Sequence, residues 1–260
     1  MNARRSLPAI AAALLLAGCA SSPQSPAKSD EPTRSETAAQ YNLQLGIAYL
    51  QQGNLPLAKE KLERAQQQDS RNPTLHGALA LLNEKLGKLR EADGYYRSAL
   101  RLAPRNPDLT NNYAVFLCRT GQVDEGLKRF TDAARNPLYG TPWRAYANAG
   151  VCLRGAKRYD EAAKYLGDAQ RLRPADPETA FQLGELELER GRPAAARDLV
   201  ERHLAQFNAT PDLLWVGVRA ARAVGDRLAE ERYARRLQRD FPDAPQTKAA
   251  QLAPRGGAAP

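Results

Sequence analysis

A regular spacing of glycines constrains the fold of this chain more than any other feature. Gly53, Gly87 and Gly121 are equally spaced, and Gly191 and Gly225 repeat the same interval. Gly121 and Gly191 are separated by two such intervals plus two residues. A period of this length accommodates a pair of helices with their turns, and such pairs bury a continuous core only by stacking on their neighbours. The spacing therefore predicts an elongated helical array.

Small residues recur within this period wherever paired helices must approach closely. One series falls in the first helix of each unit and two series fall in the second helix. A large side chain at these positions would separate the helices, because close packing requires the ridges of one helix to fill the grooves of the other. The positions are Gly46, Ala80, Ala114, Gly150 and Gly184; Ala58, Ala92, Gly126, Ala162 and Ala196; and Ala65, Ala99, Ala133 and Ala169.

The interval between the glycines matches the helix–turn–helix period of the tetratricopeptide repeat, which is about 34 residues. The expected fold class is therefore all-α, a tetratricopeptide-repeat right-handed superhelix of about six helix–turn–helix repeats over residues 37–248. Repeat four has Lys157 in place of the turn glycine. Repeat six has Val218, Glu230 and Leu237 at the small-residue positions, as expected of a terminal repeat with no successor.

The N-terminus has the pattern of an export signal. Arg4 and Arg5 precede an apolar run over residues 7–17, which is too short to span a bilayer but suits the apolar region of a signal peptide. A buried helix is the alternative, and the two preceding arginines favour the signal. We therefore expect residues 1–18 to be a lipoprotein signal peptide, for the reason given next.

Residues 16–19, LAGC, resemble the lipobox of bacterial lipoproteins. The resemblance implies that Cys19 is the lipid attachment site and the first residue of the mature protein. Two acyl chains are enough for stable anchoring to a membrane. Residues 20–21 are Ala and Ser rather than an aspartate that would favour retention in the inner membrane. The resemblance therefore implies a lipid anchor at the periplasmic face of the outer membrane.

The segments that flank the array have few apolar residues in any periodic pattern. Residues 19–36 are rich in Ser and Pro and predict a flexible tether, and residues 249–260 predict a disordered tail. The formal charge is +9, and it becomes +7 without the two arginines of residues 1–18. In an exported protein this charge favours acidic proteins or anionic lipid surfaces as partners, and no nucleic acid is expected.

The first helices of such an array line its concave face. The resemblance to tetratricopeptide proteins implies that this groove takes an extended or helical peptide of a partner protein. The groove positions combine apolar anchors with arginines, which suits a peptide with hydrophobic and some acidic side chains. The alternative for each position is a packing role in the core. The positions are Leu43, Ile47, Leu50, Asn111, Val115, Arg119, Val151, Arg154, Phe181, Glu185, Trp215, Arg219 and Arg222.

Cys118 and Cys152 fall near the ends of the first helices of repeats three and four. The axes of adjacent helices lie roughly 8–10 Å apart, and the nearest positions reach the Cα separation of about 7 Å that a disulfide needs. An oxidising compartment favours the bond, which would contribute roughly 3–4 kcal/mol. Two buried free thiols are the alternative. Metal binding is not expected, because neither segment contains a histidine or a further cysteine.

The sequence contains no pattern typical of an enzyme. A glycine-rich phosphate loop, GxSxG and HExxH are all absent, and His76 and His203 lie in different repeats. Glu185, Glu187 and Glu189 alternate along one helix, as on a solvated face or a groove wall. We therefore expect no catalysis, no cofactor, no metal and no small-molecule substrate.

The stretch 111–155 contains the motifs NNY, FLC, NPLY and NAGVC. Together with the lipobox, these motifs resemble the PilW/PilF family of type IV pilus biogenesis and stability proteins, which are outer-membrane lipoproteins of six tetratricopeptide repeats. The resemblance implies a pilotin that binds the type IV pilus secretin and promotes its outer-membrane localisation and multimerisation. The alternative is a different envelope scaffold, for peptidoglycan enzymes or for outer-membrane protein assembly.

Overall fold

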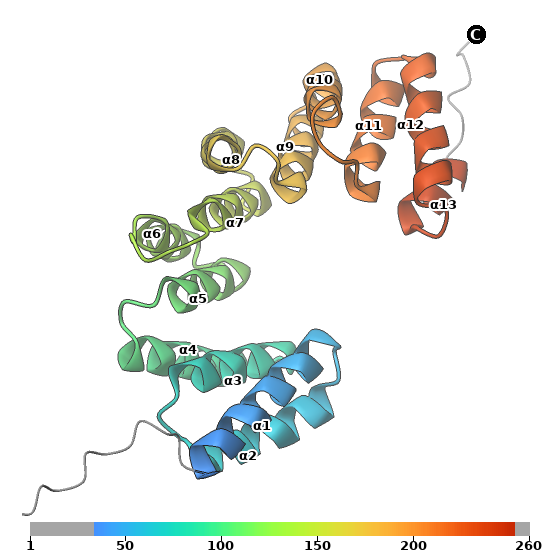
Figure 1. Cartoon of the computed structure of the whole chain (residues 1–260). Coiled ribbons are helices and arrows are strands. Elements are labelled where there is room, and N and C mark those ends of the chain that lie inside the picture. Colours follow the sequence, from blue (N-terminus) through green and yellow to red (C-terminus); the bar gives the residue numbers. More distant parts are fainter. Residues whose placement is uncertain (1–33, 253–260) are drawn as a thin grey trace, which may run out of the picture.

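The computed structural model describes residues 34–252, and every regular element in this range is a helix. The helices are α1 (Arg34–Gln51), α2 (Leu55–Gln68), α3 (Pro73–Lys85), α4 (Leu89–Leu102), α5 (Pro107–Arg119), α6 (Val123–Ala134), α7 (Pro142–Gly155), α8 (Tyr159–Leu172), α9 (Pro177–Glu189), α10 (Pro193–Leu204), α11 (Pro211–Ala223), α12 (Arg227–Asp240) and α13 (Pro245–Leu252). Consecutive pairs from α1/α2 to α11/α12 form repeats one to six, which stack into a curved array (Figure 1). This arrangement confirms the predicted fold class.

A residue in the left-handed backbone conformation follows each first helix of repeats one to six, as the glycine spacing predicts. The five turn glycines have φ between 70° and 83°. In repeat four Lys157 takes this place with φ 59°, although a side chain there costs roughly 1–2 kcal/mol by crowding the following carbonyl. The turn itself is unchanged, because Arg158 N donates to Leu153 O at 2.9 Å just as Asn54 N donates to Tyr49 O at 2.9 Å in repeat one.

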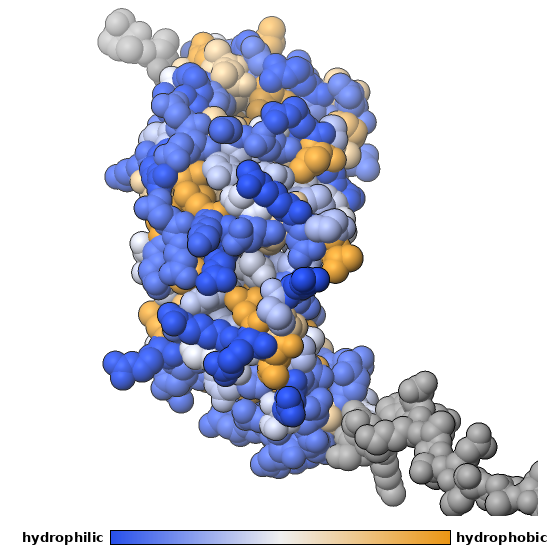
Figure 2. Space-filling model, turned by 90° about the vertical axis from the view of Figure 1, so that its left-hand side faces the viewer, coloured by the Kyte–Doolittle hydropathy of each residue, from blue (hydrophilic) through white to orange (hydrophobic). Residues whose placement is uncertain are grey.

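Asparagine or aspartate followed by proline begins several first helices. The side chains of Asn72, Asn106 and Asp176 accept hydrogen bonds from backbone N–H groups of the first turn, and the proline that follows lacks the N–H that this turn leaves unpaired. Each of these first helices therefore begins at the edge of the array where the preceding second helix ends. Figure 2 views the array from the side of Figure 1 where the α4–α5 turn lies, and shows separate apolar patches among hydrophilic side chains.

The small-residue positions set the distance between the two helices of a repeat. A Cβ at Gly150 of α7 would lie 2.5 Å from Leu166 Cγ and 3.2 Å from Leu166 N of α8. The facing second-helix alanines, Ala58, Ala92 and Ala162, are completely buried. The paired helices are therefore in contact through backbone-sized groups, as the sequence pattern predicts.

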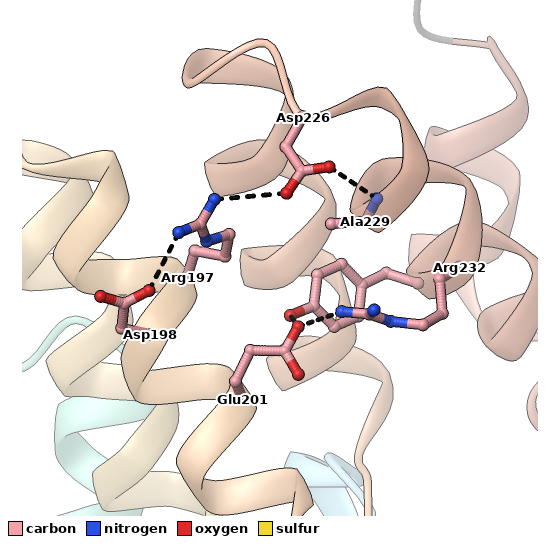
Figure 3. Close-up of polar contacts among 7 residues, drawn as sticks. Arg197, Asp198, Glu201, Asp226, Ala229 and Arg232 are labelled. Atoms are coloured by element: carbon pink, nitrogen blue, oxygen red, sulfur yellow. Dashed lines mark hydrogen bonds and ion pairs between the residues drawn. The ribbon is translucent and has the colours of Figure 1, made fainter.

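Ion pairs join the second helices of neighbouring repeats. Between repeats five and six, Arg197 of α10 lies 3.2 Å from Asp226, while Glu201 accepts hydrogen bonds from both Arg232 and Tyr233 of α12 (Figure 3). Each exposed pair contributes less than about 1 kcal/mol, but the buried Tyr233 body fixes the position of this cluster.

Cys118 of α5 and Cys152 of α7 are joined by a disulfide in the structure, with their Cα atoms 5.7 Å apart. The second helix of repeat three makes room for it, because a Cβ at Gly126 would lie 2.6 Å from Cys118 Sγ. Repeats one, two, four and five have alanine at this position. The bond links the first helices at the joint that carries the two-residue insertion.

The C-terminal end of the array differs from the prediction. The sequence predicts disorder for residues 249–260, but α13 extends to Leu252 and packs against α11 and α12. Thr247 of α13 is buried and donates a hydrogen bond to Phe241 O at 2.6 Å. Repeat six therefore does have a following helix, which lies where the first helix of another repeat would be. Its larger residues Val218 and Leu237 are completely buried.

The N-terminal boundary also shifts, because α1 begins at Arg34 and so includes the last residues of the expected tether 19–36. The expected signal peptide 1–18, Cys19 and residues 253–260 lie outside the described residues. Within residues 34–252, no helix combines the length and apolar character needed to cross a membrane.

We predict that Gly150→Ala destabilises the protein, by about 1–3 kcal/mol, because its methyl group overlaps Leu166. Gly94→Ala in α4 is the matched control, since a Cβ there meets nothing within 4 Å and alanine favours a helix by about 1 kcal/mol. Urea unfolding midpoints should shift in opposite directions for the two variants. Equal stability of Gly150→Ala and the parent protein would contradict the close contact.

We predict that the disulfide is present in the exported protein. Tryptic digestion without reduction should give peptide 106–119 joined to peptide 145–154, whereas two separately alkylated peptides would contradict the bond. Reduction should lower the free energy of unfolding by about 3–4 kcal/mol. The Cys118→Ala/Cys152→Ala variant is the control, and its stability should not respond to reductant.

Candidate peptide-binding groove

The first helices α1, α3, α5 and α7 line a hollow of about 530 Å³ on the concave side of the array. Five of the predicted groove residues line it, namely Ile47, Leu50, Asn111, Val115 and Arg119. These residues belong to repeats one and three, which are not adjacent, and α3 of repeat two lies between them. The hollow therefore spans repeats one to four.

Helix α3 supplies lining residues that are missing from the predicted set. Leu81 lies one repeat period after Ile47 and one period before Val115, and all three side chains are partly buried in the hollow. They form an apolar strip with one residue on each of three successive first helices. Translating Ile47 by one period would have identified Leu81.

Amide side chains lie beside the apolar strip, on α5 and α7. Asn148 Nδ2 donates a hydrogen bond to Asn111 Oδ1 at 3.1 Å, and Asn111 is buried. Asn112 lines the same hollow and is exposed. An amide both donates and accepts hydrogen bonds, so this arrangement suits the backbone of an extended peptide.

Three of the predicted groove arginines are paired with carboxylates, so the positive charge available in the groove must come from other residues. Arg119 forms an ion pair with Glu84, and Arg219 lies 2.7 Å from Glu185. Arg154 lies 3.9 Å from Glu189. The three arginines therefore offer less charge to an acidic peptide than the sequence pattern indicates, and Glu185 joins two helices rather than forming a solvated wall.

Lys85 and Arg144 line the hollow and have no carboxylate partner among the described residues. Their charge is available to an acidic side chain of a bound peptide. Glu84 of the adjacent wall also accepts a hydrogen bond from Tyr96 at 3.2 Å. Burial, together with the charge of Glu84, raises the pKa of Tyr96 far above its ordinary value, so Tyr96 remains a neutral donor.

The remaining predicted residues lie elsewhere. Leu43 is 3% exposed and belongs to the core of repeats one and two, so its alternative as a packing residue holds. Val151, Phe181 and Trp215 lie on α7, α9 and α11, and the last two are partly buried against the core. Arg222 pairs with Glu230 of α12 at 2.7 Å and stabilises repeat six.

The two histidines do not form part of a reactive cluster. His76 Nε2 lies 2.9 Å from Ser70 O, and His203 is buried beside the ring of Phe207, where burial lowers its pKa. Residues 34–252 contain no group of three or more His, Cys, Asp or Glu side chains that could hold a metal ion.

Models of the tetratricopeptide repeat match residues 43–107, 78–137, 117–177 and 153–215. Type IV pilus assembly protein PilF of Pseudomonas aeruginosa is 30% identical over 228 residues, which cover 87% of this chain and 90% of that protein. The match extends over nearly all of both chains and is not confined to one repeat.

Solved structures agree with this relationship. A structure of Pseudomonas aeruginosa PilF, with 28% sequence identity, superposes with a TM-score of 0.64 and covers 84% of this chain and 98% of that chain. The structure of PilW, described as a widely conserved type IV pilus biogenesis factor, has a TM-score of 0.67 at 24% identity and covers 82% and 98% of the two chains, which supports the shared fold. The chain therefore belongs to the PilF/PilW family of type IV pilus tetratricopeptide-repeat proteins, and this membership supports a role in pilus biogenesis.

Proposed function

We propose that this protein is a pilotin, a lipoprotein at the periplasmic face of the outer membrane that binds the type IV pilus secretin. In this role it promotes the outer-membrane localisation and multimerisation of the secretin. The observation that carries the proposal is the hollow of α1, α3, α5 and α7, in a chain related to a type IV pilus assembly protein over 87% of its length. The hollow supports the proposed binding surface, and the relationship supports the proposed role in assembly of the type IV pilus.

The hollow suits a peptide segment that carries both apolar and acidic side chains along its backbone. Ile47, Leu81 and Val115 offer apolar contacts at intervals of one repeat, and Asn112 offers an amide to the peptide backbone. Lys85 and Arg144 favour an acidic side chain at the rim. We therefore propose that the bound secretin segment has apolar side chains with at least one acidic neighbour.

In this proposal the lipid at Cys19, which lies outside the described residues, determines the membrane to which the bound secretin is delivered. Residues 19–33 precede the described array, and a flexible chain of that length reaches roughly 20 Å. A lipoprotein sorted to the outer membrane by its acyl chains would therefore carry a bound secretin subunit to the same membrane. High local concentration on the membrane then favours multimerisation.

We predict that Leu81→Glu reduces secretin binding by more than tenfold, because it places a charge within the apolar strip of the groove. Leu228→Glu is the matched control, since Leu228 is 80% exposed on α12, outside the hollow. Secretin multimers in outer-membrane fractions and affinity for purified secretin should fall only for Leu81→Glu. Both variants must show the parent's helical circular dichroism, and normal binding by folded Leu81→Glu would contradict the proposed groove.

We predict that Cys19→Ala moves the secretin away from the outer membrane without impairing its binding to the groove, since the two functions reside in separate parts of the chain. Fractionation of membranes, combined with affinity capture, separates these effects. Secretin multimers that remain at parental levels in the outer membrane would rule out transport by the lipid. Capture of peptidoglycan enzymes or outer-membrane assembly components in place of the secretin would favour the scaffold alternative.

A further inference from the structure

One edge of the array presents a leucine to solvent at each of three successive turns. The turns α4–α5, α6–α7 and α8–α9 form this edge, which we call the turn edge (residues 101–106, 135–141 and 171–176). Leu102 is 36% exposed, Leu138 76% and Leu172 53%. The leucines belong to three consecutive repeats, and so they lie along the array at intervals of about one repeat.

Arginines accompany these leucines, and most of them have no carboxylate partner. Arg101, Arg105 and Arg135 are exposed, and no ion pair within residues 34–252 involves them. The turn edge therefore differs from the second helices of repeats five and six, where Arg197 and Arg232 are bound to Asp226 and Glu201 (Figure 3). Its positive charge is available to an external partner.

The three turns are fixed to one another. Asn136 Nδ2 donates to Arg105 O at 2.9 Å, which joins the α6–α7 turn to the α4–α5 turn. The guanidinium of Arg173 lies 4.5 Å from the ring centre of Trp143, which joins the α8–α9 turn to the start of α7. These contacts make the turn edge one continuous surface.

The two-residue insertion has an ordered structure within this surface. Leu138 N donates to Asn136 Oδ1 at 2.9 Å, and Tyr139 is 6% exposed. With its neighbours held in this way, Leu138 is presented outward at low conformational cost. An exposed leucine on an ordered loop is suited to insertion into the interfacial region of a membrane or to contact with an apolar surface.

The turn edge also lies on the side of the array where the chain enters it. Helix α1 begins at the side where the α2–α3 and α4–α5 turns lie (Figure 1), and the residues that precede it lead to Cys19. Figure 2 faces this side and shows apolar patches that are separated by hydrophilic side chains. The first residue of α1, to which the segment with the proposed anchor is joined in the sequence, thus lies on the side that presents the leucines and the unpaired arginines.

We propose that the turn edge binds the surface of an anionic phospholipid bilayer. Its leucines enter the interfacial region, and Arg101, Arg105 and Arg135 contact lipid phosphates, as leucines and arginines do at membrane surfaces. Separate leucines favour a bilayer over a protein partner, because protein interfaces depend on a contiguous desolvated centre. This inference goes beyond the proposed secretin binding and depends on that proposal only for the location of the protein.

The binding would orient the groove. First helices begin at the turn edge and run away from it, so α5 and α7 would project from the membrane and the hollow between them would open along its surface. A secretin subunit bound in the hollow would then already lie beside the bilayer into which it assembles.

Vesicle flotation tests the proposal with the mature chain, residues 19–260, carrying Cys19→Ala so that no acyl chain is attached. The chain should float with vesicles of phosphatidylcholine and phosphatidylglycerol, much less with phosphatidylcholine alone, and less at high salt. The variant Arg101→Gln/Arg105→Gln/Arg135→Gln should lose affinity by about fivefold for each arginine. Leu138→Ser should also weaken binding.

The α3–α4 turn on the opposite edge, together with the middle of α6, provides controls that are matched in charge and polarity. The α3–α4 turn presents Leu89, which is 48% exposed, with Lys88 and Arg90, and Lys128 is exposed on α6. Lys88→Gln/Arg90→Gln/Lys128→Gln makes the same change of net charge, and Leu89→Ser the same change of polarity. Both controls should bind vesicles within about twofold of the parent, since they leave the turn edge intact.

Three results would overturn the proposal. The first is failure of the mature chain to bind anionic vesicles. The second is an equal loss of affinity in the two triple variants, which would show that total charge and not the turn edge governs binding. Loss of secretin binding by the turn-edge variant, with no vesicle binding by the parent chain, would assign the edge to a protein partner. Normal vesicle binding with no secretin binding would instead contradict only the proposed function.

Discussion

The close contact between a glycine on the first helix and a leucine on the second sets the spacing of the paired helices in repeats one and four. At Gly150 one added carbon would overlap Leu166, and at Gly46 it would lie 2.6 Å from Leu62. Each repeat buries its core only against the next one, so a change of spacing in one repeat is transmitted to its neighbours. The hollow lies along the first helices α1, α3, α5 and α7, and the contacts of Gly46 and Gly150 fix the second helices that pack behind α1 and α7.

The joint between repeats three and four departs from this regularity and is reinforced in three ways. The disulfide of Cys118 and Cys152 links α5 to α7, with Gly126 leaving space for the sulfur. Asn148 is hydrogen-bonded to Asn111 on the groove side. The inserted loop is held by Asn136 at the turn edge. The insertion therefore lengthens the connection without loosening the stack, and both proposed binding surfaces cross this joint.

Periodicity makes the helices and their close contacts predictable, because turn glycines and small residues are needed at fixed places whatever the partner. The groove is predictable where a residue can be moved by one period, as from Ile47 to Leu81. The ion pair of Arg219 with Glu185 is not, because it depends on how side chains of neighbouring repeats meet. Helix α13 also escapes prediction, since it follows the last repeat of the periodic pattern and its burial of Thr247 arises only from packing on repeat six.

The central claim is that the first helices of repeats one to four hold a segment of the secretin. Site-specific photocrosslinking in cells tests it most directly, with the crosslinking residue at Val115 in the hollow and, for comparison, at the exposed Lys128 on the second helix of the same repeat. We expect a covalent adduct with the secretin from position 115 and none from position 128. Equal adducts from both positions, or adducts with other envelope proteins alone, would contradict it.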